Sequence, residues 1–528
     1  MAMQRKSRTR PAIPTRHIEI ETKLELDPDA PLPLLTGRGP LTKVGITDAQ
    51  PPVVHDLDAV YFDTEGQDLL RSKITLRRRT GGADDGWHVK LPSAAGARTE
   101  VALPLEAGDP AIPAALAHLV SGAARGRVLR PVARITNHRT VHRLIGTDGS
   151  ELVEVADDRV KAHALGADGH ELPGSATAWR EVEAELLSGT RDQLAATVAV
   201  LCEAGATPAS SASKLARALG EHGDGKAATA AKAKRRQLPA GEVVTAALGR
   251  ARDAIITTDR ALREHTPSAL HDARAAARRA RSVLRVFRRL FDPVAADRLA
   301  NGLGKHAALL SPARDLEVIA GRLDRQLVDE PSSYADPARA CLGAALDRRS
   351  AQARAEVERH LSSATYFQLL RDLDAFVAEP PLADRAARPA TAELPTHLVA
   401  AWRRLKTLGD GLATDPDAAP NAHEARKRAK ELRYATEAAA AALGEPAVLF
   451  AAAVEQVQEV LGELQDAVVT AALLAELALS ENTDGQAGFT FGRLHAFEQA
   501  GAHGALEEFL DAWDRVADGE LLSELVRS

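Results

Sequence analysis

Charged and apolar side chains alternate in residues 17–26, which read His-Ile-Glu-Ile-Glu-Thr-Lys-Leu-Glu-Leu. Successive side chains of a β-strand point to opposite faces, so this alternation predicts a strand with one charged face. Glu19, Glu21 and Lys23 share that face. On an ordinary surface strand, such a face is simply exposed to water. In a closed barrel it would instead line the interior.

Later segments of the same region repeat this alternation with ionisable residues of both signs. Acidic pairs lie at its beginning and its end, and basic residues dominate its middle. The basic positions are Arg77, Arg79, Lys90, Arg98 and Arg139, and the later acidic ones are Glu100, Glu154, Asp158, Glu181, Glu183 and Glu185. If these strands close into a barrel, one side of the lining is carboxylate and the other is guanidinium or ammonium.

Such a lining suits a linear triphosphate with bound metal ions. Carboxylate oxygens are the ligands that Mg²⁺ and Mn²⁺ prefer, and these ions need only a few protein ligands besides substrate oxygens. Arginine and lysine bind phosphate oxygens, arginine with two parallel hydrogen bonds. The alternative is a β-sandwich whose charged faces are wet and bind nothing.

A second candidate site lies on two helices of the C-terminal half. At about 100° per residue, the basic residues of each helix fall on one face, here called a basic stripe. The first stripe is His271, Arg274, Arg278, Arg281 and Arg285, and the second is His423, Arg426, Lys430 and Arg433. A basic helix face is ordinarily just solvated. However, the seven arginines between His271 and Arg289 meet one acid, Asp272, so pairing within the helix cannot neutralise them.

The two stripes belong to an internal repeat, which predicts two units of one helical module packed side by side. About forty residues after each stripe comes a similar sequence, Arg314-Asp315 in the first copy and Gln465-Asp466 in the second. The second stripe also gives way to Glu437. We therefore expect unequal affinities for an anion. Metal chelation by the two histidines is disfavoured because each helix has one histidine, with arginine neighbours that would repel a cation.

The 528-residue chain is expected to be an α+β multidomain protein. Residues 17–220 read as an antiparallel β-barrel, closed by short helices at 191–204 and 214–219. Residues 240–525 read as an all-α domain of two repeats. Residues 221–239 read as a linker with a basic cluster, solvated rather than nuclear-targeting or nucleic-acid-binding.

Composition further restricts the classes of protein to which the chain could belong. Residues 1–16 are basic without an apolar core, which predicts a disordered tail and not a signal peptide. No apolar stretch approaches the length of a membrane span, and we expect a cytoplasmic protein. Cys202 and Cys341 lack metal-ligand spacing. The net charge of −6 argues against general nucleic-acid binding. The sequence leaves the oligomeric state open.

Glu19-Ile-Glu-Thr-Lys23 resembles the ExExK element of the CYTH domain, the fold of the triphosphate tunnel metalloenzymes. This superfamily includes inorganic triphosphatases, thiamine triphosphatases and class IV adenylate cyclases. The resemblance covers about residues 17–220, and further segments look like successive strands of the family in order. They are Tyr61–Thr64, Ile74–Arg79, Trp87–Pro92, Asp158–Val160, Trp179–Glu185 and Ser213-Lys214.

The resemblance implies a hydrolase with a two-metal site for Mg²⁺ or Mn²⁺. The implied metal positions are Glu19, Glu21, Asp158, Glu183 and Glu185. The implied phosphate-binding positions are Lys23, Arg77, Arg79, Lys90, Arg139 and Lys214, and the catalytic element is Glu19, Glu21 and Lys23. The implied reaction is in-line attack of water on a terminal phosphorus, with the metals neutralising the phosphate chain and orienting and acidifying the water. No protein general base is assigned.

The helical half resembles the CHAD domain, a helical module implicated in polyphosphate binding. The matching elements are His271–Phe287, Arg314-Asp315, His423–Tyr434 and Leu461–Asp466, within about residues 240–525. This resemblance implies that both basic stripes bind inorganic polyphosphate. Nucleic acid remains an alternative ligand, because phosphate contacts alone do not distinguish the two.

The leading hypothesis is an inorganic triphosphatase acting on tripolyphosphate, with a polyphosphate-docking domain attached. The first rival is a polyphosphate-binding protein whose tunnel turns over little or nothing. The second rival acts on thiamine triphosphate or ATP, although 3% aromatic content offers few residues to stack an adenine. Tripolyphosphate and long-chain polyphosphate are the expected partners, and nucleic acid and membranes are not.

Overall fold

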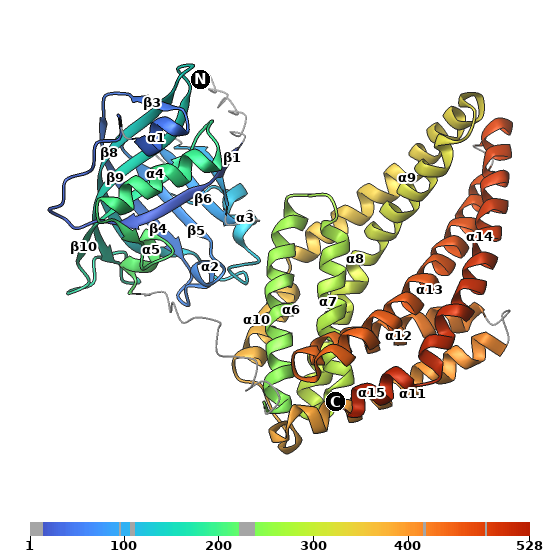
Figure 1. Cartoon of the computed structure of the whole chain (residues 1–528). Coiled ribbons are helices and arrows are strands. Elements are labelled where there is room, and N and C mark those ends of the chain that lie inside the picture. The colour runs from blue at the N-terminus through green and yellow to red at the C-terminus, as the bar shows by residue number, and fades with distance from the viewer. Residues whose placement is uncertain are drawn as a thin grey trace, which may run out of the picture. The chain divides into compact units, whose positions relative to one another are not determined.

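The computed structural model describes residues 14–37, 39–93, 97–105, 111–220, 238–414, 419–480 and 483–527. The chain divides into two compact units, residues 1–226 and 227–528 (Figure 1). Unit 1 is a β domain and unit 2 is helical, which confirms the predicted fold class. Residues 1–13 of the predicted tail and 221–237 of the predicted linker lie outside the described residues.

Unit 1 is an antiparallel sheet with short helices. Its strands are β1 (Thr15–Glu19), β2 (Glu21–Glu25), β3 (Ile46–Ala49), β4 (Val53–Asp63), β5 (Thr75–Thr80), β6 (Gly86–Pro92), β7 (Arg98–Pro104), β8 (Arg130–Gly146), β9 (Glu151–Ala164), β10 (Thr177–Leu186) and β11 (Thr207–Pro208). Its helices are α1 (Gly39–Lys43), α2 (Asp68–Arg71), α3 (Ala114–Val120), α4 (Arg191–Glu203) and α5 (Lys214–Ala218). The strand order is β1-β7-β6-β5-β4-β8-β9-β10-β2-β11, with β3 beside β8.

The predicted strand at residues 17–26 is two strands that meet at Ile20. β1 pairs with β7, and β2 pairs with β10 and β11. Because β1 and β2 follow each other directly, the sheet begins and ends on the same stretch of chain and closes on itself. The prediction of a tail up to Arg16 is wrong at its end, since Thr15 and Arg16 pair with Ala102 and Val101 of β7.

The outer face of β2, β9 and β10 forms an apolar core. Leu24, Val155 and Val182 are buried there together with Leu194 and Leu201 of α4. α4 begins at a capping box in which Thr190 and Gln193 hydrogen-bond to each other's backbone amides. With the outer positions fixed in this core, the alternate residues of each strand must face inward. The charged face is thus directed into the closed sheet.

Helix α5 covers one end of the interior. Ser213 caps the helix by accepting a hydrogen bond from the amide of Ala216. Leu215 is buried in a cluster with Tyr61 and Ile135. The first residue of the helix, Lys214, is thereby held against the inward-facing carboxylates of β9 and β10.

Unit 2 consists of helices in two consecutive series. The first series is α6 (Ala240–Arg263), α7 (Ala269–Val286), α8 (Pro293–Val328), α9 (Ser332–Leu361) and α10 (Ala364–Ala378). The second is α11 (Ala390–Thr414), α12 (Ala419–Leu443), α13 (Glu445–Ala478), α14 (Gly485–Ala517) and α15 (Glu520–Arg527). Neighbours pack in the same order in each series, and α7 also packs against α12. The predicted repeat therefore corresponds to two helix series that meet at the two basic stripes.

Small side chains let α7 and α12 approach their neighbours closely. Ala276 and Ala280 of α7 and Ala425 and Ala429 of α12 are buried in the shared core. The basic stripes occupy the other faces of these helices. In the part of the chain that the structure describes, no helix is long and apolar enough to cross a membrane.

Candidate functional sites

The inward-facing charged residues of unit 1 surround a cavity of about 270 Å³. Its walls bring together residues that lie as far apart in the sequence as Glu19 and Lys214. The predicted site residues that line it are Glu19, Lys23, Arg77, Arg79, Lys90, Arg139, Glu183, Glu185 and Lys214. Glu100 and Glu154, for which no role was assigned, line it as well. The two remaining predicted residues, Glu21 and Asp158, are buried beside it and contact lining residues.

One wall of the cavity is cationic. Arg77 and Arg79 of β5 lie beside Lys90 of β6, and Arg139 lines the same cavity from β8. Burial, together with Arg77 and Arg139, lowers the pKa of Arg79 to about 9. The buried Nε atoms of Arg77 and Arg79 have no hydrogen-bond partner among the described residues. Unsatisfied buried donors are costly, so this wall favours an anionic ligand.

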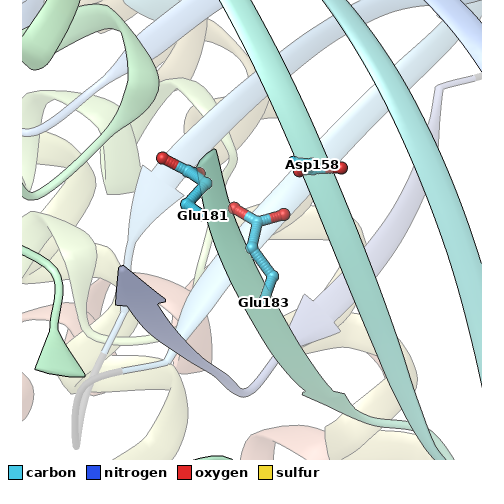
Figure 2. Close-up of side chains that lie close together, drawn as sticks. All are labelled: Asp158, Glu181 and Glu183. Atoms are coloured by element: carbon cyan, nitrogen blue, oxygen red, sulfur yellow. The ribbon is translucent and has the colours of Figure 1, made fainter. Parts of the chain in front are cut away.

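The opposite wall holds three buried carboxylates within metal-ligand spacing, Asp158 of β9 with Glu181 and Glu183 of β10 (Figure 2). Cations already contact all of them. Arg139 donates two hydrogen bonds to Asp158, 2.8 and 2.7 Å long, and one of 2.6 Å to Glu183. Lys214 Nζ lies 2.9 Å from Asp158 and from Glu183 and also contacts Glu181.

These contacts leave the cluster electrically compensated. Lys214, Lys23 and Arg139 outweigh the effect of burial and hold the pKa of Glu183 well below its usual range. Arg139 and Lys214 likewise lower the pKa of Asp158 to about 2 against the effect of burial. A metal ion would have to displace or repel these cations. We interpret this cluster as the ionic anchor that fixes Arg139 and Lys214.

A different row of carboxylates is compensated less evenly. Glu21 of β2 lies directly opposite Glu185 of β10, which in turn lies opposite Glu154 of β9. Like charges directly opposite each other on adjacent strands are destabilising. Burial, followed by Glu19, raises the pKa of Glu185 to about 7. Lys23 Nζ lies 3.3 Å from Glu21 and Arg143 Nε 3.3 Å from Glu154, so Glu185 is the least compensated member of the row. Among the described residues only Asp158, Glu181 and Glu183 already have metal-ligand spacing, so a cation at Glu185 would require Glu19 or Glu21 to move toward it.

Glu19 connects the two walls. Its carboxylate accepts a 2.6 Å hydrogen bond from Lys90 Nζ, and burial followed by Glu100 raises its pKa despite that bond. Lys23 is bound between Glu21, at 3.3 Å, and Glu183. The ExExK residues therefore contact both the carboxylate row and the phosphate-binding wall.

The sequence analysis assigned no role to three residues that the structure places at this site. Glu181 accepts hydrogen bonds from Trp179 and Lys214, and Tyr61 accepts one from Arg77. Asn137 lines the cavity with its Oδ1 unpaired among the described residues. Strand alternation placed Glu181 on the charged face. Tyr61 and Asn137 gave no comparable signal because they carry no charge.

In unit 2 the two basic stripes line one cavity of about 880 Å³. All the predicted stripe residues border it, from α7 and α12, and residues of α8 and α13 complete its walls. Burial, together with Arg426, Arg278 and Arg274, lowers the pKa of Lys430 to about 6. Burial also lowers the pKa of Arg278 and Arg281. Crowded cations of this kind are stabilised when an anion enters.

Glycines on the flanking helices make room for two of these arginines. A Cβ atom at Gly304 of α8 would come within 3.1 Å of Arg281 Nε, and one at Gly462 of α13 within 2.9 Å of Arg426 Nη2. Both guanidinium groups thus lie directly across a helix backbone.

Acids from neighbouring helices neutralise part of the first stripe, which the sequence analysis did not foresee. Asp315 pairs with Arg274 at 2.8 Å, and Glu431 pairs with Arg285 at 2.9 Å. Arg278 and Arg281 have no ion pair among the described residues. An anion is therefore not needed to offset all seven arginines. Arg278 and Arg281 are the two whose charges still favour one.

The stripe histidines line the cavity without forming a metal site. His423 Nδ1 lies 3.0 Å from Gln465 Oε1, and burial followed by Arg314 lowers the pKa of His271. Neither histidine belongs to a group with metal-ligand spacing in the described chain.

Comparison with known proteins assigns both units. The family model of the CYTH domain matches residues 17–219, and that of the CHAD domain matches residues 246–475. Uncharacterized proteins from two strains of Mycobacterium tuberculosis are each 36% identical over 502 residues, 92% of this chain and 93% of theirs.

Two solved structures resemble part of the chain. PptA from Streptomyces chartreusis is 22% identical with a TM-score of 0.45, and the match covers 52% of this chain and 99% of that one. A CHAD domain from the plant Ricinus communis is 24% identical with a TM-score of 0.42, covering 52% and 93%.

Substitutions in the two carboxylate clusters of unit 1 should have different effects on the affinity for metal ions. We expect Glu185→Gln to weaken Mn²⁺ binding about tenfold or more, because it removes an uncompensated ligand. Glu181→Gln, four residues away on the same face of β10, should change it less than about twofold. Titration of each folded variant with Mn²⁺, followed by electron paramagnetic resonance, measures both. A larger loss of Mn²⁺ affinity in Glu181→Gln would instead indicate that the metal binds at the cluster of Asp158, Glu181 and Glu183.

Proposed function

The chain belongs to the family of proteins that join a CYTH domain to a CHAD domain, and we propose that it hydrolyses inorganic tripolyphosphate and binds polyphosphate. The proposed hydrolysis rests on the way charge is distributed between the two walls of the unit 1 cavity. Phosphate-binding cations occupy one wall, and the other holds Glu185, whose pKa is raised by burial and by neighbouring carboxylates. A linear triphosphate with its metal ions supplies the charges that both walls lack.

The proposed substrate contacts follow from the positions of the cations. Arg77, Arg79 and Lys90 face the interior from neighbouring strands, and Arg139 faces it from β8. Arg139 is held by Asp158 and Glu183, so its guanidinium keeps one orientation before substrate arrives. Such fixed donors stabilise charge on the leaving phosphate oxygens without reorganisation during the reaction.

The proposed cofactor is Mg²⁺ or Mn²⁺ in a two-metal site. Glu19, Glu21 and Glu185 are the residues best suited to hold it, with Glu183 and Asp158 as the further positions implied by the family. When bound, the ions neutralise the phosphate chain and activate the attacking water. Lys90 and Lys23 keep Glu19 and Glu21 in position for this role.

The second part of the proposal concerns the unit 2 cavity. Arg278, Arg281, Arg426 and Lys430 crowd around it, and burial lowers the pKa of three of them. A polyphosphate chain offers one negative charge on every phosphate, which matches this cationic surface. Binding there would raise the local concentration of substrate ends for the attached hydrolase.

The alternatives differ in specific ways. A cyclase needs a place to stack adenine, yet Tyr61 is the only Phe, Trp or Tyr among the described residues that line the unit 1 cavity. Thiamine triphosphate meets the same difficulty with its rings. A binding protein without catalysis would not need Glu185 to lie among the carboxylates of Glu19, Glu21 and Glu154. Nucleic acid competes for the unit 2 cavity through its phosphates alone.

Separate variants test the division of labour. Glu19→Gln removes a proposed metal ligand and should lower tripolyphosphate hydrolysis at least about a hundredfold while leaving long-chain polyphosphate binding intact. Arg278→Glu combined with Lys430→Glu should weaken polyphosphate binding by a similar factor and spare hydrolysis of soluble tripolyphosphate. Phosphate release and isothermal titration calorimetry measure the two activities. Equal loss of both activities in either protein would refute the division.

Polyphosphate affinity should fall as pH rises above 6, because of Lys430. Its lowered pKa of about 6 leaves it largely neutral at pH 8 in the free protein. A bound polyanion favours the charged form, so binding takes up a proton and affinity falls by up to about tenfold per pH unit. Below pH 6 the affinity should level off. The carboxylate of Asp466 raises the pKa of Lys430, but burial and the three arginines outweigh this effect.

Calorimetry in buffers with different heats of ionisation counts the proton taken up at pH 7.5. Lys430→Arg is the control, since arginine stays protonated and should remove the pH slope. Internal phosphates of a long chain remain ionised across this range, so the ligand adds little of its own. The same slope in both proteins would show that Lys430 is not the group that titrates.

A further inference from the structure

The two repeats place different residues at equivalent positions around the unit 2 cavity. His271 aligns with His423, and Asp315 aligns with Asp466, so Arg281 corresponds to Arg433. On the flanking helices, Gly304 of α8 corresponds to Glu455 of α13. Arg281 thus faces a glycine on the flanking helix, whereas Arg433 faces a glutamate carboxylate.

Every nitrogen of the Arg433 guanidinium has a partner within the protein. Nε donates to Glu437 at 2.7 Å, Nη1 donates to Gln458 at 3.3 Å, and Nη2 lies 2.6 Å from Glu455. These are charge-assisted contacts of the kind a phosphate would otherwise make. Arg433 is satisfied before any ligand arrives.

Arg281 has the opposite surroundings. It lies across Gly304, and its buried Nε has no hydrogen-bond partner among the described residues. The carboxylate that raises its pKa, Glu431, is bound to Arg285 and Arg428. Arg281 therefore has donor capacity left for a ligand.

Glu437 and Glu455 differ in what else they hold. Arg285 pairs with Glu431 and Arg279 with Glu437, and the repeat exchanges these two pairs. Glu437 thus belongs to a symmetric contact between α7 and α12. Glu455 pairs only with Arg433 among the described residues, and its side chain is 39% exposed. Glu455 therefore takes no part in the symmetric contact between α7 and α12.

We propose that Glu455 occupies the second repeat's anion site as an internal competitor, so that a polyanion binds mainly to Arg278 and Arg281 with Arg426 and Lys430. This inference rests on the proposed binding of polyphosphate in unit 2. It removes Arg433 from the set of phosphate-binding residues that the sequence predicted. It also gives the cavity an open end near Arg281 and a closed end at Arg433, so a bound chain is held asymmetrically.

The test compares substitutions of the equivalent residues Arg281 and Arg433. It then removes the carboxylate of Glu455, which is proposed to occupy Arg433. Binding of long-chain inorganic polyphosphate to the full-length protein is measured by calorimetry. Arg281→Gln should weaken it about tenfold, the cost of one charge-assisted contact, and Arg433→Gln less than about twofold. Glu455→Gln should tighten binding about threefold or more. In the Glu455→Gln background, Arg433→Gln should then cost about threefold or more, cancelling the gain.

Salt dependence separates a ligand contact from a structural effect. If Glu455→Gln frees Arg433 for phosphate, the slope of log affinity against log salt concentration steepens by about one. A change that only alters packing leaves this slope unmoved. Arg281→Lys serves as a second variant if Arg281→Gln fails to fold, and circular dichroism checks each protein.

The outcomes are distinct. Absence of binding by the unaltered protein defeats the proposed function itself. Binding that is weakened equally by Arg281→Gln and Arg433→Gln, with no gain from Glu455→Gln, preserves the proposed function and overturns the internal competitor.

Discussion

The structure depends on enclosing many charges within two interiors where water cannot fully solvate them. An enclosed charge is tolerated only when an opposite charge or a set of hydrogen bonds faces it. In unit 1 this condition is met for Asp158, Glu181 and Glu183, which face Arg139, Lys23 and Lys214. It is met only in part for Glu185, which lies among Glu19, Glu21 and Glu154, and for the arginines of β5. The unmet charges mark where metal and phosphate would enter.

Closure of the sheet makes this enclosure possible. The break at Ile20 lets one stretch of chain pair with β7 on one side and β10 on the other. α4 and its neighbours take the apolar outer face, and α5 covers an end of the interior with Leu215 while presenting Lys214. In unit 2, glycine and alanine achieve a similar result by letting guanidinium groups lie against helix backbones. There the compensation is unequal between the repeats, and Arg281 and Arg433 are its clearest contrast.

Residue spacing was sufficient to predict the fold class, most strands and the charged faces, because side-chain periodicity is a local property. It also predicted that the residues of each stripe share one helix face, and in the structure they line the unit 2 cavity. What it could not supply were partners from distant segments. The strand break at Ile20 depends on pairing with β7, which also carries the ordered chain back to Thr15. Asp315, Glu431 and Glu455 neutralise stripe arginines from other helices. The repeat singled out Asp315, but no local pattern identifies these pairings. The roles of Glu181 and Tyr61 likewise depend on Lys214 and Arg77 reaching them.

The measurement that tests the central claim most directly is phosphate release from a panel of substrates. Tripolyphosphate, ATP, thiamine triphosphate and long-chain polyphosphate are each incubated with the protein and Mg²⁺ or Mn²⁺, with a chelator as control. The account predicts rapid release from tripolyphosphate that the chelator abolishes, with slow or no release from ATP and thiamine triphosphate. No release from any substrate, with tight polyphosphate binding retained, would contradict it and show a binding protein with a silent tunnel.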